Sequence, residues 1–403
     1  MLVSAKDIYK LWTEKGRGWT LHHINESVEK GELSMHDFSL RDMAEHLIPD
    51  GSEFIRLMNP RRRSGQTIFE AVDAVDTSAF SHITGQLIFS TINDAMKLDT
   101  LIGDQLVTVM PSQFQDAERI PGISNASDEF ADEITEGEPY PLVGLSEEYV
   151  TIPRAEKHGG ILGITREAII ADRTGVLVDR ARTIGTGLAI RREKAILNVF
   201  IGAVNPYARN GEARITYHDT NMGFDNIITD ALANYTAIQA AETAFRRMRD
   251  PATGEPLGLS IDTIVVVPAL LWLGRQIIHA TEIRQDQRPV LAAGAVAINQ
   301  IGVNPIPFEL QILSNEWLRD LLLAADGVSG LDTDGAKVDS FWFIGKPKAC
   351  FVWKEIWPLT VEEAPQNNEA QFSQDIWMRF KCSYKGVPGV REPRLMIRSD
   401  GTA

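Results

Sequence analysis

The chain has 403 residues and a net charge of −15, with 44% hydrophobic and 24% charged residues. The composition is that of an ordinary globular protein, and the length exceeds what one compact core usually covers, so two or more domains are expected. The acidic balance argues against a protein that wraps nucleic acid with a broad basic face. The sequence has no run of about 18 apolar residues, so no membrane span is predicted.

The first 75 residues are polar and predict an extended arm with short helices. The N-terminus lacks the basic and apolar regions of a signal peptide, which predicts a cytoplasmic protein. Ser39 is a candidate N-cap for a helix carrying Leu40, Met43 and Leu47 at helical spacing. The basic run Arg61, Arg62 and Arg63 is a candidate contact with DNA or with an acidic neighbour; a solvated loop is the alternative.

The next segments predict a helix over 77–97 and then an acidic excursion. Residues 116–148 hold ten acidic residues against one base, Arg119, with several Pro and Gly residues, so this segment cannot form a core of its own. Strands predicted at 149–153 and 159–167 indicate a long hairpin around it, and because an isolated hairpin is marginally stable, it should rest on a neighbouring subunit.

Helices and strands alternate in the remainder. The longest helix is predicted at 176–200, where Gly185 and Gly187 allow another backbone to approach closely. A second helix is predicted at 224–249, a buried strand at 263–267, and a helix from Pro268 to His279. Later strands are predicted at 340–344, 350–357 and 375–384, the last two flanking a polar hairpin tip.

Neither catalytic nor metal-binding motifs occur in the sequence. The paired acids Asp128/Glu129 and Glu147/Glu148 lack the ligand spacing of a calcium loop, which favours a solvated face. Cys350 and Cys382 are expected to be buried, reduced thiols. The expectation is therefore a non-enzyme without cofactor or metal; an unfamiliar enzyme using the acids of 116–148 is an alternative.

Five segments carry a family resemblance: VDTSAFSHITGQ (75–86), ITREAIIAD (164–172) before the long helix, LGLSIDTIVVVPALL (257–271), FWFIGKPK (341–348), and the stretch from 375 to 391. Taken in this order, they resemble major capsid proteins of tailed bacteriophages with the Hong Kong 97-like fold, and in particular Mu-like major head subunits. The resemblance covers residues 75–398. Each motif is short, so their order and spacing carry the weight.

The resemblance implies an α+β fold divided into named parts. The N-terminal arm would be 1–75, and the extended E-loop hairpin 116–165. The peripheral domain would comprise 76–115, 166–249 and 339–403, with the spine helix at 174–201 and the P-loop at 362–374. The axial domain would be 250–338.

It also implies a structural function. The protein would self-assemble into hexamers and pentamers of an icosahedral shell that encloses double-stranded DNA without sequence-specific binding. Portal, scaffolding or decoration proteins would be further partners, and no membrane is involved. The shell would be assembled in the bacterial cytoplasm and found in the virion. An encapsulin-like compartment shell is the alternative.

The predicted contacts between subunits lie on the two polar hairpins, and the P-loop would meet its copies near local three-fold axes. The E-loop has no lysine except Lys157 at its base, so the covalent cross-link of some members is not expected. The predicted contact residues are Asp128, Glu129, Asp132, Glu133, Glu136, Glu138, Glu362, Glu363, Asn367, Asn368 and Glu369.

Overall fold

The structure is a computed structural model whose chain divides into two compact units. Unit 1 comprises residues 1–99, 156–192 and 356–386, and unit 2 comprises residues 100–155, 193–355 and 387–403. The residues that the structure describes are 10–11, 13–16, 19–20, 22–23, 26–27, 39–47, 77–98, 100–121, 149–171, 173–218, 224–249, 256, 260–280, 282–285, 300–303, 310–328, 330–333, 335, 337–364 and 376–401.

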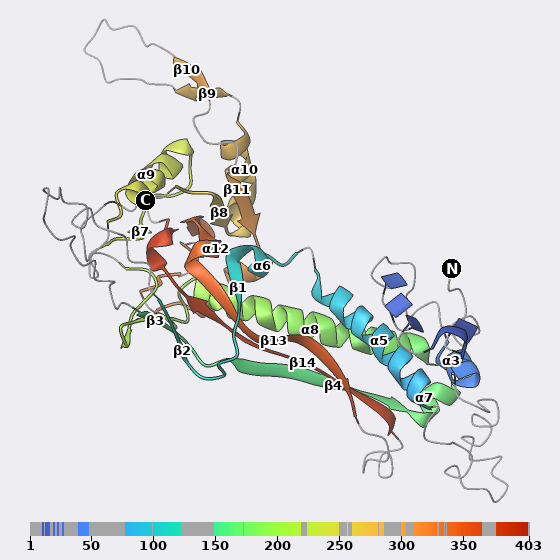
Figure 1. Cartoon of the computed structure of the whole chain (residues 1–403). Helices are drawn as coiled ribbons and strands as arrows, with labels where there is room; N and C mark the ends of the chain where they lie inside the picture. Colours follow the sequence, from blue (N-terminus) through green and yellow to red (C-terminus); the bar gives the residue numbers. More distant parts are fainter. Residues whose placement is uncertain are drawn as a thin grey trace, which may run out of the picture. The chain divides into compact units, whose positions relative to one another are not determined.

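Unit 1 is built on two helices and a strand pair (Figure 1). Helix α5 (Thr77–Met96) and the first part of α8 (Thr174–Phe200) approach closely, because a Cβ on Gly185 would lie 2.6 Å from the carbonyl oxygen of Ile92. Strand β4 (Glu156–Thr165) pairs antiparallel with β14 (Ile376–Val390). The predicted close approach is confirmed at Gly185, whereas a Cβ on Gly187 would meet nothing within 4 Å.

Two short helices of unit 1 follow the capping rules. In α3 (Leu40–Leu47), the backbone N–H of Asp42 donates to the hydroxyl of Ser39, as the sequence predicts. Helix α7 (Arg166–Ile170) begins in the same way, with Thr165 accepting from the N–H of Ala168.

Unit 2 contains a five-stranded sheet in the order β11-β8-β12-β15-β7. The strands are β7 (Ile227–Ile228), β8 (Thr263–Val266), β11 (Gln311–Ser314), β12 (Trp342–Gly345) and β15 (Met396–Ser399). Strand β8 is parallel to β11 and antiparallel to β12, and β15 is antiparallel to β12 and parallel to β7. The uninterrupted β-branched run of β8 is buried at every position, because both faces of this sheet are covered.

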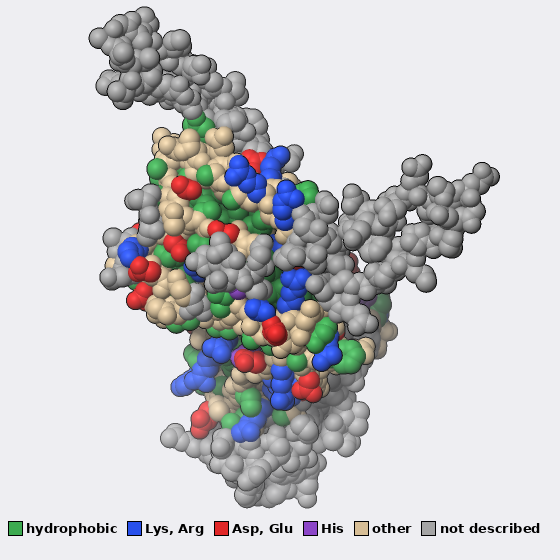
Figure 2. All heavy atoms as spheres, turned by 90° about the vertical axis from the view of Figure 1, so that its left-hand side faces the viewer, with side chains coloured by type: hydrophobic (Ala, Val, Ile, Leu, Met, Phe, Trp, Pro, Cys, Tyr) green, Lys and Arg blue, Asp and Glu red, His purple; other side chains and the backbone are tan. Residues whose placement is uncertain are grey.

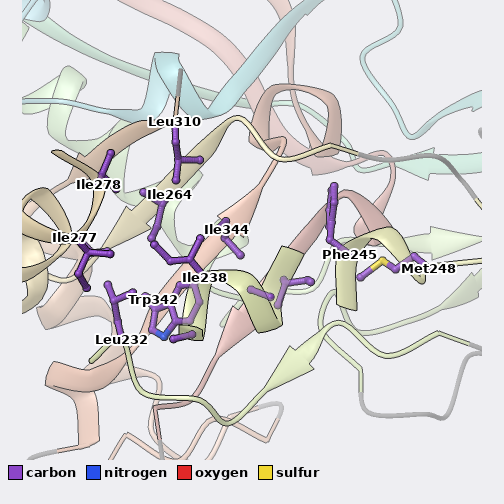
Figure 3. Close-up of a cluster of buried hydrophobic side chains, with 14 residues drawn as sticks. Leu232, Ile238, Phe245, Met248, Ile264, Ile277, Ile278, Leu310, Trp342 and Ile344 are labelled. Atoms are coloured by element: carbon purple, nitrogen blue, oxygen red, sulfur yellow. The ribbon is translucent and has the colours of Figure 1, made fainter. Parts of the chain in front are cut away.

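Helices α9 (Tyr235–Arg246) and α10 (Leu271–His279) pack on one face of this sheet, as Figure 3 shows. The face is formed by alternate residues of the central strands, and Phe245, Ile238 and Ile277 of the helices meet it. Its strand residues are Ile264, Val266, Trp342, Ile344 and Ile397. A Cβ on Gly274 would lie 2.6 Å from the side chain of Ile312, so α10 lies close against β11.

The opposite face of the sheet packs against the end of α8. Phe343 points away from the α9–α10 side, and its ring centroid lies 4.8 Å from that of Phe200. The Tyr217 ring joins this aromatic cluster and donates its hydroxyl to the carbonyl of Phe200.

Strands β13 (Phe351–Glu363) and β14 have residues in both units, and the remaining elements of unit 2 are short. They are α6 (Gly103–Leu106), β1 (Val107–Pro111), β2 (Glu118–Pro121), β3 (Tyr149–Ile152), β5 (Ala208–Arg209), β6 (Glu212–Ala213), η4 (Pro268–Leu270), β9 (Glu282–Gln285), β10 (Gln300–Val303), α11 (Glu316–Ala324), η5 (Lys337–Ser340), α12 (Pro347–Cys350) and η6 (Pro393–Leu395). Strand β13 pairs parallel with β1 in unit 2 and neighbours β14 along the chain's last hairpin.

Three expectations are corrected. The predicted helix over 224–249 begins only at Tyr235, because Asn234 caps it there and 227–228 form β7. The strands predicted on either side of residue 155 exist but do not pair with each other: β3 pairs with β2, and β4 pairs with β14. Strand β13 runs to Glu363, so Glu362 and Glu363 lie in the strand and not in the predicted loop.

Candidate assembly surfaces

The strands on either side of the acidic segment 122–148, β2 and β3, pair antiparallel with each other. Pro121 at the end of β2 is opposite Tyr149 at the start of β3, and Glu118 is opposite Ile152. Val150 and Ile152 are buried, and the guanidinium of Arg119 lies 4.6 Å from the centre of the Tyr149 ring. The β2–β3 pair at the two ends of the acidic segment is therefore a packed part of unit 2, in place of the predicted pairing of 149–153 with 159–167.

A turn after α8 holds β3 from its other edge. The N–H of Tyr149 donates to the side chain of Asn210, and the N–H of Asn210 donates to the carbonyl of Tyr149. Asn210 and Gly211 both have positive φ, which suits the tight turn between β5 and β6. These strands form a four-stranded sheet in the order β2-β3-β5-β6.

A buried lysine joins the hairpin base to β13. The side chain of Lys354 is fully buried, with its ammonium 3.3 Å from the carboxylate of Glu118 and 2.7 Å from the carbonyl oxygen of Asp116. Glu118 also accepts from the hydroxyl of Ser112. Sequence reasoning missed this lysine; its signal is a charged residue flanked at alternate positions of the strand by the apolar Val352 and Ile356.

A buried carboxylate organises the segment before β1. Glu193 of α8 accepts the N–H of Ile102 and Gly103 and the side-chain amide of Asn315, at 2.8 to 3.0 Å. An added Cβ on Gly103 would lie 2.5 Å from the carboxylate, so a larger residue there would displace the Glu193 side chain from these hydrogen bonds. Asn315 also caps α11 by accepting from the N–H of Trp317, so one carboxylate fixes two chain segments.

The last hairpin is held together by charge and by aromatic contacts in unit 1. Glu362 forms an ion pair with Lys381, whose hydrogen bond and charge lower the pKa of that carboxyl, with a smaller contribution from Lys157. The ammonium groups of Lys157 and Lys385 lie 5.6 and 5.2 Å from the Trp357 ring centre. The charge of Glu362 is thus balanced within its own chain.

Most of the predicted contact residues lie outside the described residues. Of the set, the structure describes Glu362 and the backbone of Glu363. Those outside it are Asp128, Glu129, Asp132, Glu133, Glu136, Glu138, Asn367, Asn368, Glu369, Arg61, Arg62 and Arg63. Contact between subunits through these residues stays a prediction.

Both cysteines are free and buried, as the sequence predicts. Burial raises the pKa of the Cys382 thiol to about 11 and that of Cys350 well above its ordinary value. Among the described residues, no group of three His, Cys, Asp or Glu side chains is placed to hold a metal ion. Within the same residues, no helix is long and apolar enough to cross a membrane.

The sequence model of the phage capsid protein family matches residues 147–399, from just before β3 to the last residue of β15. The chain belongs to this family. It is a structural capsid protein, a subunit of the shell of a bacteriophage head. No curated protein matches the chain.

Solved structures similar to this capsid protein include other shells. The cyanophage P-SCSP1u capsid covers 73% of this chain and 86% of its own at 13% identity and a TM-score of 0.39. The mature capsid of bacteriophage PhiM1 covers 75% and 87% at 15% identity and a TM-score of 0.41. A virus-like particle from Pyrococcus furiosus covers 77% and 97% at 10% identity and a TM-score of 0.38. With TM-scores this low, the family match carries the assignment.

Proposed function

We propose that this is the major capsid protein of a tailed phage with the Hong Kong 97-like fold, whose hexamers and pentamers close into an icosahedral shell around double-stranded DNA. The observation that carries the proposal is the family match over residues 147–399, which includes all five strands of the sheet in unit 2. Among the strands that the structure describes, β1 and β2 precede the match. In this proposal the axial domain is 250–338, and the peripheral domain comprises 76–115, 166–249 and 339–403 with the spine helix at 174–201.

The hairpin base supports an E-loop over 116–165. An extension can contact a neighbour in a defined place only if its base is fixed, and β2 and β3 are fixed by Lys354, Asn210 and the buried Val150. The acidic residues between them need basic partners, because like charges at this density repel one another. A neighbouring subunit provides those partners in this proposal.

The charge of the protein suits a container that must release its contents. Figure 2 shows one face on which basic and acidic side chains are interspersed over the described residues, and the whole chain carries −15. A shell wall of this kind encloses DNA without the tight, salt-dependent binding that a basic surface would give. Portal, scaffolding and decoration proteins belong to the same proposal as partners, as does assembly in the host cytoplasm.

Sedimentation of the purified full chain tests the proposal. Shells would sediment far faster than the 44.7 kDa subunit, and negative-stain images of that fraction would show closed particles. A stable monomer across protein concentration and salt would contradict it.

A further inference from the structure

Helix α10 presents an exposed stripe to solvent. Gly274, Ile277 and Ile278 face the sheet, while Trp272, Arg275 and His279 are exposed at spacings of three and four residues. Residues so spaced lie within about 60° of one another around a helix. Trp272 is 79% exposed, the highest fraction for a large hydrophobic side chain among the residues that the structure describes. An apolar ring of this size in water is typical of a surface that a partner covers.

Helix α11 presents a stripe of the opposite charge. Leu318 and Leu322 are buried, while Glu316, Asp320 and Leu323 are exposed at spacings of four and three residues. Leu323 is 37% exposed, and Val328 in the following turn is 41% exposed. The stripe is therefore acidic at the N-terminal end of the helix and apolar at its C-terminal end.

The two stripes match each other when the helices are antiparallel. An alignment that sets Trp272 opposite Leu323 also sets Arg275 opposite Asp320, because three residues separate the pair on each helix. His279, four residues after Arg275 on the stripe, then lies opposite Glu316. Each apolar group meets an apolar group, and the basic groups meet the carboxylates.

The two stripes belong to different sides of unit 2. Helix α10 packs on the sheet face that carries Ile264 and Ile344. Helix α11 begins at Asn315, which is bonded to Glu193 of α8, and α8 packs through Phe200 on the opposite face. Surfaces on opposite sides of a subunit join head to tail, and such contacts generate a ring when the rotation between neighbours closes.

We propose that α10 of one subunit packs antiparallel on α11 of a second copy of this chain, with Trp272 as the central anchor. The contact rests on the proposed shell function, and it assigns a specific ring-forming interface to it. The side chain of Trp272 is covered by Leu323 and Val328 of the neighbour, and the ion pair of Arg275 with Asp320 sets the register.

Charge reversal tests the register. Arg275→Glu and Asp320→Arg, made singly, should each lower shell yield by about tenfold or more, since each places like charges together beside the anchor. The double variant restores the opposite charges and should recover most of the yield, and Arg275→Lys should assemble as the unaltered protein does. Circular dichroism and thermal melting of the subunits verify that each variant folds.

A cross-link tests the geometry without disturbing the anchor. A chain carrying His279→Cys and Glu316→Cys should form disulfides between copies on oxidation. A denaturing, non-reducing gel should then show a ladder of cross-linked subunits that ends at the number of subunits in the ring. The matched control pairs His279→Cys with Val204→Cys, a substitution at an exposed site of unit 2 outside both stripes, and should give no ladder.

The outcomes separate this contact from the function on which it rests. Normal shells from Arg275→Glu, or a double variant as defective as the single ones together with no ladder, would overturn the contact while unaltered protein still formed shells. Failure of the unaltered protein to form shells would overturn the proposed function, and the contact with it.

Discussion

The ammonium group of Lys354 lies 3.3 Å from the carboxylate of Glu118, and the lysine side chain is fully buried while that of Glu118 is 20% exposed. The pair connects the strand at the base of the acidic hairpin to the strand that continues into the last hairpin. A buried charge left without its partner costs far more than a pair removed together, so this contact makes the position of β2 depend on β13.

Glu118→Gln should therefore destabilise the subunit by about 3 kcal/mol, because it leaves a buried ammonium facing a neutral amide. Lys354→Met should cost less, and the double variant should be more stable than Glu118→Gln alone. Urea unfolding of the unassembled subunit measures all three. Additive effects of the two substitutions would show that the pair is not coupled.

The two glycines of α8 should respond in opposite ways to alanine. Gly185→Ala should destabilise the subunit, since its Cβ would lie 2.6 Å from the Ile92 carbonyl oxygen and 2.9 Å from the Cβ of Ala95. Gly187→Ala meets nothing within 4 Å and should stabilise the helix by up to about 1 kcal/mol. Thermal melting distinguishes them, and equal shifts in melting temperature would contradict the close packing of α5 on α8.

Glu362 should make stability depend on pH. Lys381 lowers the pKa of this carboxyl in the folded chain, so the ion pair stabilises the fold above the ordinary glutamate pKa and its contribution is lost as the pH falls through the lowered one. Glu362→Gln should thus be slightly less stable than the unaltered protein near neutral pH and equally stable well below about pH 4. A stability difference that does not change with pH would contradict this role.

A double variant separates two roles of the predicted P-loop. If the loop contacts its copies, Glu369→Gln in the loop together with Glu363→Gln at the end of β13 should alter shell yield or the salt dependence of assembly, because acids gathered at a symmetry axis repel one another. Glu362→Gln serves as the control, since its charge is already balanced within the chain. Unchanged assembly in the double variant would favour a solvated turn.

Shortening the acidic excursion should leave a folded subunit that does not assemble. Replacing residues 123–147 with a short Gly-Ser turn retains the pairing of Pro121 with Tyr149, so the circular dichroism spectrum and the melting temperature should change little. Light scattering should then show subunits or small oligomers. Shells of normal size and yield would contradict the E-loop proposal.

Local periodicity predicted the elements that depend on local sequence. Helices α5, α8 and α10, strand β8 and the Ser39 cap follow from apolar spacing, Pro268 and capping chemistry, and the structure has them within a few residues. The helix over 224–249 was predicted too long, because residues 227–228 are apolar in a spacing that suits a helix but pair with β15 instead. The pairing of residues 227–228 with β15 therefore overrides the local helical spacing in that segment.

The arrangement of the candidate site could not be predicted in the same way. The pairing of β3 with β2, and of β4 with β14, joins residues that local spacing does not connect. Lys354 with Glu118, and Glu193 with Ile102, Gly103 and Asn315, are contacts between residues about 90 or more positions apart. A single charged residue in a strand or helix gives no sign of which distant partner neutralises it.

Electron microscopy of the purified full-length protein under assembly conditions tests the central claim most directly. The account predicts closed icosahedral particles built from hexameric and pentameric rings, with α10 of each subunit against α11 of the next. A homogeneous population of single subunits, or open aggregates without rings at every salt and protein concentration tried, would contradict it.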